Sequence, residues 1–192
     1  MSETDKKTSQ ILERLGVLQI GHFRLTSGRH SDKYMQCARL FEHPVESGEL
    51  CADLAGLFGG CGIDLVAGPA LGGIIMAYET ARALGVRNIF AERENGVMTF
   101  RRGFSVVPGE RVLVVEDVVT TGGSVKEVVA LILKAGATLV GVGAIVDRSG
   151  GRLDFCAPFH PLLAMSVESW SEADCPLCKA GRPIAKPGSR VI

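Results

Sequence analysis

The most constraining feature of this sequence is a series of short Val-, Leu- and Ile-rich runs, separated by segments of helical periodicity. The runs lack polar alternation, which is typical of strands buried on both faces of a parallel sheet. We predict strands over residues 64–67, 87–91, 111–115 and 138–146. We predict helices over residues 6–15, 50–58, 72–84 and 124–134, and a small antiparallel section over 17–39. This alternation indicates an α/β fold with a central, mostly parallel sheet flanked by helices.

Composition and charge narrow the class of protein. The chain has 192 residues, which fits one domain. Its 21 Lys and Arg residues balance its 21 Asp and Glu residues, so we expect no nucleic-acid or membrane partner. No apolar stretch approaches the ~20 residues of a membrane span, and residues 1–10 are too polar for a secretory signal. Together with scattered cysteines, these features predict a cytoplasmic protein with free thiols.

One segment carries most of the predicted chemistry. The apolar run Val112–Val115 predicts a buried strand, and Glu116 and Asp117 follow at its carboxyl end. A Thr- and Gly-rich turn, Thr120–Ser124, then leads into a predicted helix. Glycines let backbone amides approach an anion, and the first amides of a helix are free donors. The turn therefore predicts a phosphate site that needs no lysine.

The two carboxylates predict a different partner from the turn. They can accept hydrogen bonds from sugar hydroxyls or hold Mg²⁺ through water. An ordinary capped strand–turn–helix is the alternative, because Ser124 and Glu127 have the spacing of a capping box. That alternative accounts poorly for two adjacent acids at the end of a buried strand, where the loss of solvent is costly.

The segment resembles the signature of type I phosphoribosyltransferases, which use 5-phosphoribosyl 1-diphosphate (PRPP). The resemblance implies the type I phosphoribosyltransferase fold with a small N-terminal hood. It implies that the acidic pair contacts the ribose hydroxyls and that the turn holds the 5′-phosphate. It also implies Mg²⁺ as cofactor, bound through PRPP, with Asp117 as a ligand through water. The implied PRPP-binding residues are Glu116, Asp117, Thr120, Thr121, Gly122, Gly123, Ser124, Ala70, Gly72 and Arg93.

Three further segments resemble the orotate-specific branch of this family. Gly21–Tyr34 resembles the hood over the base, and Val66–Gly73 resembles the loop that takes the pyrophosphate. Ile145–Arg148 resembles the strand end that places an Arg near orotate. The implied orotate-binding residues are Thr120, Arg148, Ser27, Tyr34 and Lys33.

Each of these segments also has a structural explanation that needs no ligand. Gly68 and Gly72-Gly73 could serve close helix–strand packing. Arg148 could form a surface salt bridge. Ser27-Gly28 could be a hairpin turn, and Tyr34 could belong to the core of the hood.

The stretch 91–102 resembles the family's mobile loop, which closes over the active site, often across a dimer interface. The implied catalytic residues are Glu116, Asp117, Arg93, Arg101 and Arg102. The sequence departs from the usual pattern, since no Lys or His lies between Glu92 and Arg102. Gly72 and Thr26 also stand where lysines are common. Arg101-Arg102 and Lys33 are candidates for the missing charge, and the alternative for the Arg pair is a solvated hairpin edge.

The C-terminal segment, residues 171–192, is rich in Pro, Gly and charged residues. This composition predicts either a weakly structured tail or a segment that covers part of the surface. Within it, Cys175 and Cys178 have metal-ligand spacing. Cys156 and His160 are candidates to complete a set of four, and a redox-inert turn is the favoured alternative.

These inferences predict a single phosphoribosyltransferase domain over residues 1–192, with residues 1–40 contributing the hood. We expect the chain to join orotate to PRPP, giving orotidine 5′-monophosphate and pyrophosphate in pyrimidine biosynthesis. The resemblance implies a homodimer. The alternatives are a purine or uracil phosphoribosyltransferase, and a non-catalytic PRPP sensor that binds nucleic acid, which the balanced charge disfavours.

Overall fold

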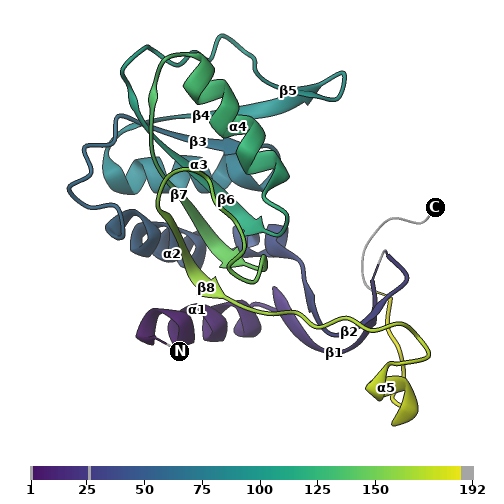
Figure 1. Cartoon of the computed structure of the whole chain (residues 1–192). Helices are drawn as coiled ribbons and strands as arrows, with labels where there is room; N and C mark the ends of the chain where they lie inside the picture. Colours follow the sequence, from purple (N-terminus) through teal and green to yellow (C-terminus); the bar gives the residue numbers. More distant parts are fainter. Residues whose placement is uncertain (1, 26, 187–192) are drawn as a thin grey trace.

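A computed structural model describes residues 2–25 and 27–186 of the chain (Figure 1). Thr26, named above at a position where lysine is common, lies outside the described residues. The strands are β1 (Leu18–Arg24), β2 (His30–Met35), β3 (Leu65–Pro69), β4 (Arg87–Glu94), β5 (Val97–Phe100), β6 (Arg111–Val119), β7 (Thr138–Asp147) and β8 (Phe159–Ala164). The helices are α1 (Glu3–Arg14), the 3₁₀ helix η1 (Cys37–Glu42), α2 (Pro44–Gly56), α3 (Gly72–Leu84), α4 (Gly123–Lys134) and α5 (Pro176–Lys179).

Six strands form the central sheet, in the order β5-β4-β3-β6-β7-β8. All neighbours in it are parallel except β4 and β5, which form an antiparallel hairpin. The predicted α/β architecture is therefore confirmed. The order reverses between β3 and β6, because the chain first builds outward through β4 and later builds the other way through β7. In open α/β sheets a ligand site lies at such a reversal, beyond the carboxyl ends of the strands.

The sheet separates two apolar clusters. On one face, Leu113 and Val115 of β6 pack with residues of α1, α2 and α3. On the other, Val112 and Val114 pack with the buried residues of α4. Successive side chains of a strand point to opposite faces, so one apolar run supplies both clusters. This explains the absence of polar alternation in the sequence.

Several predicted element boundaries need correction. The strand predicted over residues 111–115 continues to Val119, because Val118 and Val119 still pair with β7. The acidic pair therefore lies inside β6 and not after it. The strand predicted over 87–91 continues to Glu94 and turns into β5, which the sequence reading missed. β8 was also missed.

Some helix boundaries also differ: the helix predicted over 50–58 is α2, which spans Pro44–Gly56. The helix predicted over 72–84 is confirmed as α3. α1 begins earlier than predicted, because Ser2 and Asp5 form a capping box. The capping box predicted from Ser124 and Glu127 is wrong: the N-cap of α4 is Gly122, which makes no side-chain cap.

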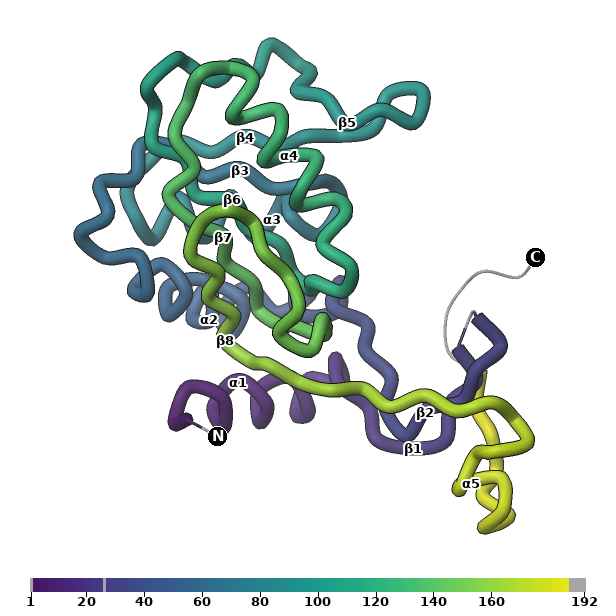
Figure 2. The backbone as a smooth tube through the Cα atoms, in the orientation of Figure 1, coloured from purple at the N-terminus to yellow at the C-terminus, as the bar shows by residue number. Residues whose placement is uncertain are grey.

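The β1–β2 hairpin forms the predicted antiparallel section and projects from the sheet (Figures 1 and 2). The C-terminal segment runs back along this hairpin, with bridges between Phe23 and Ala185 and between His30 and Trp170. It is therefore a cover, as far as residue 186, and residues 187–192 lie outside the described part. Among the described helices, none has the length and apolar character needed to cross a bilayer.

Candidate active site

Two loops meet at the reversal of the sheet. One joins β3 to Gly72, the first residue of α3, and the other joins β6 to α4 and contains Thr120–Gly122. Since β3 and β6 are adjacent parallel strands, both loops leave the same edge of the sheet. The sequence pattern had predicted a ligand site at each loop, and the topology makes them neighbours.

The acidic pair reaches two different loops. Glu116 lines a pocket with residues 118–125. Asp117 lies against Gly72 at the start of α3. Backbone amides hold both side chains: Asp117 N–H donates to Glu116 Oε1 at 3.3 Å, and Val118 N–H donates to Asp117 Oδ1 at 2.8 Å. The pair therefore borders both loops.

The electrostatics of the pair favour a ligand that neutralises negative charge. Burial is the largest cause that raises the pKa of both Glu116 and Asp117, and for Glu116 the negative charge of Asp117 adds to it. No salt bridge within residues 2–25 and 27–186 involves either carboxylate. Two oxygen ligands without a protein cation fit a divalent ion or the hydroxyl donors of a sugar.

The turn after β6 is built as an anion site. Gly122 has a left-handed backbone, with φ of 72°, and α4 starts directly after it without a side-chain cap. Lys126 N–H, which donates to Gly122 C=O at 2.9 Å, is the first amide of α4 with an acceptor inside the helix, so the amides of residues 123–125 have no acceptor there. These amides, and the hydroxyls of Thr120, Thr121 and Ser124, belong to residues that line the same pocket as Glu116. A phosphate fits such a helix start.

The loop between β3 and α3 combines packing with site geometry. A Cβ on Gly68 would collide with the backbone of Gly73, so these two glycines serve close packing. Gly72 is different, because a Cβ there would collide with the carboxylate of Asp117. Ala70 and Leu71 join β3 to α3, and Leu71 also makes no side-chain cap.

Arg148 follows β7 and lies next to the end of β6. Its backbone N–H donates to Val119 C=O at 2.8 Å, which ties it to the end of β6. Its side-chain Nε is buried and has no hydrogen-bond partner among the described residues. Arg148 also forms none of the salt bridges found within the described ranges, so the salt-bridge explanation is not supported.

Cys37 is a neighbour of the site that sequence reasoning missed. Burial is the largest cause that raises the pKa of its thiol, and the charge of Asp117 raises it further while Arg148 lowers it. Cys37 begins η1, directly after β2, so the base of the projecting hairpin reaches the acidic pair. No pattern in the sequence links Cys37 to residues 80 positions away.

Comparison with known proteins identifies the family. The phosphoribosyl transferase domain matches residues 46–158. An orotate phosphoribosyltransferase of Pelotomaculum thermopropionicum is 59% identical over 182 residues, which cover 95% of this chain and 96% of the relative. One from Thermotoga maritima is 56% identical, covering 94% and 97%. The chain belongs to the orotate phosphoribosyltransferase family.

Solved structures agree with this assignment. The orotate phosphoribosyltransferase of Mycobacterium tuberculosis in complex with inorganic phosphate aligns with a TM-score of 0.69 and 26% identity, covering 85% of this chain and 96% of that one. An adenine phosphoribosyltransferase from Thermoanaerobacter pseudethanolicus, 18% identical, shares the fold with a TM-score of 0.61 and coverage of 69% and 88%. The predicted fold class is thus confirmed.

The arginines predicted to serve the family's closing loop lie on or after the β4–β5 hairpin. Arg93 contacts Glu127 of α4 at 2.8 Å, which brings the hairpin to the helix that starts at the phosphate turn. Glu127 thus pairs across elements and does not cap its own helix. Arg101 and Arg102 pair with Glu92, and Arg101 also pairs with Glu94. All three arginines are exposed, and their catalytic roles stay predictions.

The residues predicted from the family's hood lie along the β1–β2 hairpin. Ser27 is exposed in the turn of the hairpin, which projects away from the sheet (Figure 2). Tyr34 packs on Phe23 with tilted rings and donates to Gln36 Oε1 at 3.0 Å, so it belongs partly to the hood's own packing. Lys33 Nζ lies 3.7 Å from Asp32. No hydrogen bond among the described residues joins these three to the acidic pair, and their contacts with a base stay predictions.

Proposed function

We propose that this chain transfers the 5-phosphoribosyl group from PRPP to orotate, giving orotidine 5′-monophosphate and pyrophosphate in pyrimidine biosynthesis. The observation that carries the proposal is the pair Glu116 and Asp117 beside an uncapped helix start, at the reversal of the sheet. The near full-length similarity to orotate phosphoribosyltransferases supports orotate as the accepting base.

Different parts of PRPP bind to the turn Thr120–Ser124, here called the phosphate turn, and to the acidic pair. The amides and hydroxyls of Thr120–Ser124 bind the 5′-phosphate, for which the helix start supplies donors and partial positive charge. Glu116 and Asp117 accept hydrogen bonds from the ribose hydroxyls. The pyrophosphate binds at the backbone of the loop that contains Ala70 and leads to Gly72, where the Asp117 carboxylate lies against the start of α3. Arg93 approaches from the hairpin.

The residues of the site also fit Mg²⁺ bound through PRPP. Two half-buried carboxylates with raised pKa values and no salt-bridge partner in the described part of the chain supply oxygen ligands, which Mg²⁺ prefers. Asp117, next to the pyrophosphate side, is the residue placed to hold the ion through water. When bound, Mg²⁺ neutralises charge on the leaving pyrophosphate.

Orotate binds on the side of β7. The buried Arg148 Nε has no protein partner among the residues described, so a guanidinium donor is available for a planar carboxylate. Thr120, the first residue of the turn that binds the phosphate, directly follows Val119, whose C=O accepts from Arg148 N–H. Thr120 can therefore contact both the base and the phosphate. The hood completes the base side when the β1–β2 hairpin folds inward on binding. Its contacts with the base come from Lys33, Tyr34 and Ser27.

The chemistry needs positioning more than a strong base. Positive charge develops at the anomeric carbon, and the ring nitrogen of orotate is already acidic. The carboxylates orient the ribose, and the main-chain amides hold the phosphate, so the two reacting atoms are brought together. The β4–β5 hairpin closes over the site and excludes water. The arginines on or after it then stabilise charge on the departing pyrophosphate; they are Arg93, Arg101 and Arg102.

We propose one domain over residues 1–192, with 1–40 as hood and 171–192 as cover, assembled as a cytoplasmic homodimer. Leu71, Ile75 and Tyr78 form an exposed apolar stripe along α3, at helical spacing. Such a stripe fits a second copy of the chain. Light scattering tests this: Ile75→Glu should yield monomers, whereas Val45→Glu, at an exposed position of α2, should not. A monomeric parent protein contradicts the dimer.

The function is tested by following PRPP consumption with orotate, adenine, hypoxanthine, xanthine and uracil, each with Mg²⁺. Of the five bases, only orotate is expected to be consumed. A preference for another base refutes the assignment. Asp117→Asn should lower turnover by orders of magnitude and leave the circular dichroism spectrum unchanged. A nucleic-acid shift assay at two salt concentrations tests the alternative of a non-catalytic PRPP sensor that binds nucleic acid. We expect no binding.

A further inference from the structure

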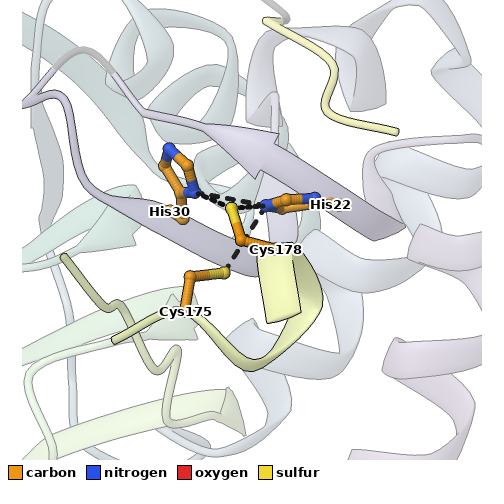
Figure 3. A group of neighbouring side chains, drawn as sticks. All are labelled: His22, His30, Cys175 and Cys178. Carbon is orange, nitrogen blue, oxygen red and sulfur yellow. Dashed lines mark hydrogen bonds between the residues drawn. The ribbon is translucent and has the colours of Figure 1, made fainter. Parts of the chain in front are cut away.

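Four side chains outside the active site gather at the distal hairpin (Figure 3). His22 comes from β1, His30 from β2, and Cys175 and Cys178 from the segment around α5. One ligand atom from each lies within 4.8 Å of all the others. The side chains of His22, His30 and Cys175 are buried, with exposed fractions of 5%, 3% and 0%, so they face one another away from solvent.

The distances match a tetrahedral ion. His22 Nε2 lies 3.2 Å from His30 Nδ1, 3.5 Å from Cys175 Sγ and 3.7 Å from Cys178 Sγ. Cys178 Sγ lies 3.2 Å from His30 Nδ1. Zinc bonds of about 2.3 Å to sulfur and about 2.0–2.1 Å to nitrogen place tetrahedral ligands roughly 3.3–3.8 Å apart. The four atoms therefore surround a space of the size that one ion takes.

A second contact prepares His22 as a ligand. Its Nδ1 lies 2.9 Å from the backbone carbonyl of Arg182. A carbonyl only accepts, so Nδ1 carries the proton, and in the neutral ring the lone pair is on Nε2, which points at the cluster. Histidine ligands of metals commonly donate their other ring N–H to such a carbonyl.

We propose that His22, His30, Cys175 and Cys178 bind one structural Zn²⁺. Two imidazoles and two thiolates, arranged tetrahedrally, suit zinc, and four protein ligands close the site to water and substrate. A two-iron cluster is less suitable, because its histidine and cysteine pairs bind different irons, whereas here His22 Nε2 is close to both sulfurs. The earlier candidates Cys156 and His160 are wrong: neither belongs to the cluster, and His160 packs on Phe58.

The ion would join the C-terminal segment to the hairpin. Hydrogen bonds also join the two. Arg24 N–H donates to Ala185 C=O, Ala185 N–H donates to His22 C=O, and His30 and Trp170 exchange backbone hydrogen bonds. Arg29 donates to Ser169, and Ser31 Oγ donates to Glu168 C=O. Both described core clusters draw mainly on the sheet and on helices α1 to α4. Where little apolar surface is available, a metal supplies the stability that a core otherwise provides.

Metal content tests the proposal directly and does not depend on enzyme activity. The full-length protein, purified without chelator or affinity metal, should contain roughly one zinc per chain by plasma mass spectrometry. Cys178→Ser and His30→Ala should lose it. Cys156→Ser, which changes an exposed cysteine outside the cluster, and His160→Ala should keep it. A parent protein that contains no zinc and takes up none from a zinc buffer overturns the proposal.

The parent protein itself provides a second test, in case the ligand variants misfold. Replacement of zinc by Co²⁺ should give the visible bands of a tetrahedral site and a thiolate charge-transfer band. A pink octahedral spectrum without charge transfer contradicts the ligand set. Thiol titration of the unfolded parent should find all six cysteines reduced, because a Cys175–Cys178 disulfide would exclude the ion. If the parent protein contains zinc but does not turn over orotate, the proposed function is refuted and the zinc site is supported.

Discussion

The carboxylate of Asp117 occupies the space that a side chain on Gly72 would need. Gly72 is the first residue of α3, directly after the loop that follows β3, and Asp117 lies near the end of the neighbouring strand β6. The absence of a Cβ at the first helical position of α3 therefore allows the carboxylate of Asp117 to lie against the start of this helix.

Gly72→Ala should displace the Asp117 carboxylate and lower kcat/KM for PRPP about a hundredfold, because small misplacements of reacting groups have effects of that size. The fold should persist, since alanine is favoured over glycine in helices. Steady-state kinetics at varied PRPP measures the effect. Gly56→Ala in α2 is the matched control, because a Cβ there meets nothing within 4 Å. Equal kinetics in the two variants would contradict the placement of Asp117.

Glu116→Gln should stabilise the substrate-free protein at alkaline pH while it removes activity. Burial and Asp117 raise the pKa of Glu116 from 4.5 to about 9, so the folded state keeps a proton that the unfolded state releases between these values. The stability of the parent protein therefore falls as pH rises through this window, and the variant lacks this loss.

Thermal melting at about pH 5.5 and about pH 8.5 measures this linkage. The gain in Tm of Glu116→Gln over the parent should be larger at the higher pH. Binding of Mg²⁺ with PRPP should also release a proton from the parent protein, which calorimetry in two buffers of different ionisation enthalpy detects. A Tm difference independent of pH would show that Glu116 is already ionised in the empty site.

Gly122→Ala should destabilise the protein and weaken PRPP binding. The φ of 72° costs an L-residue about 1–2 kcal/mol, and a Cβ would lie 2.9 Å from Leu153 Cδ1 and 3.1 Å from Phe155. Denaturant unfolding measures the loss. Gly123→Ala is the neighbouring control, because its Cβ would lie 3.7 Å from Thr121 and its backbone needs no positive φ. If both variants unfold at the same denaturant concentration, the conformation assigned to the turn is incorrect.

Arg148→Ala should raise the KM for orotate by tenfold or more, on the order of one lost charge-assisted hydrogen bond, and should change the KM for PRPP much less. The buried, unpartnered Nε of Arg148 motivates this expectation. Arg82→Ala removes an exposed guanidinium that pairs with Glu79, and it should leave both constants unchanged. Equal increases in the two KM values would remove Arg148 from the base side.

Arg101→Ala and Arg102→Ala should mainly lower kcat, because they are expected to act when the hairpin closes on the pyrophosphate. In the open structure they pair with Glu92 and Glu94 at the surface, where ion pairs contribute roughly 0–1 kcal/mol. Melting temperatures should therefore stay close to that of the parent. Unchanged kcat in both variants would leave them as a solvated hairpin edge.

Local patterns made much of this fold predictable. α3 begins and ends where predicted, and the run Val112–Val115 is buried on both faces. The prediction from Ser124 and Glu127 failed because a capping box describes only contacts within one helix. Glu127 instead pairs with Arg93 of β4, a contact that no local pattern encodes.

The sequence by itself determined the alternating elements, the acidic pair, the glycine-rich turns and the family. Only the tertiary structure decided that Gly72 makes room for Asp117, that Cys37 lies beside the acids, and that His22 and His30 join Cys175 and Cys178. Spacing along the chain specifies neighbours within one strand or helix. His22 and Cys175 are 153 positions apart, so their meeting depends on how the hairpin and the C-terminal segment pack together.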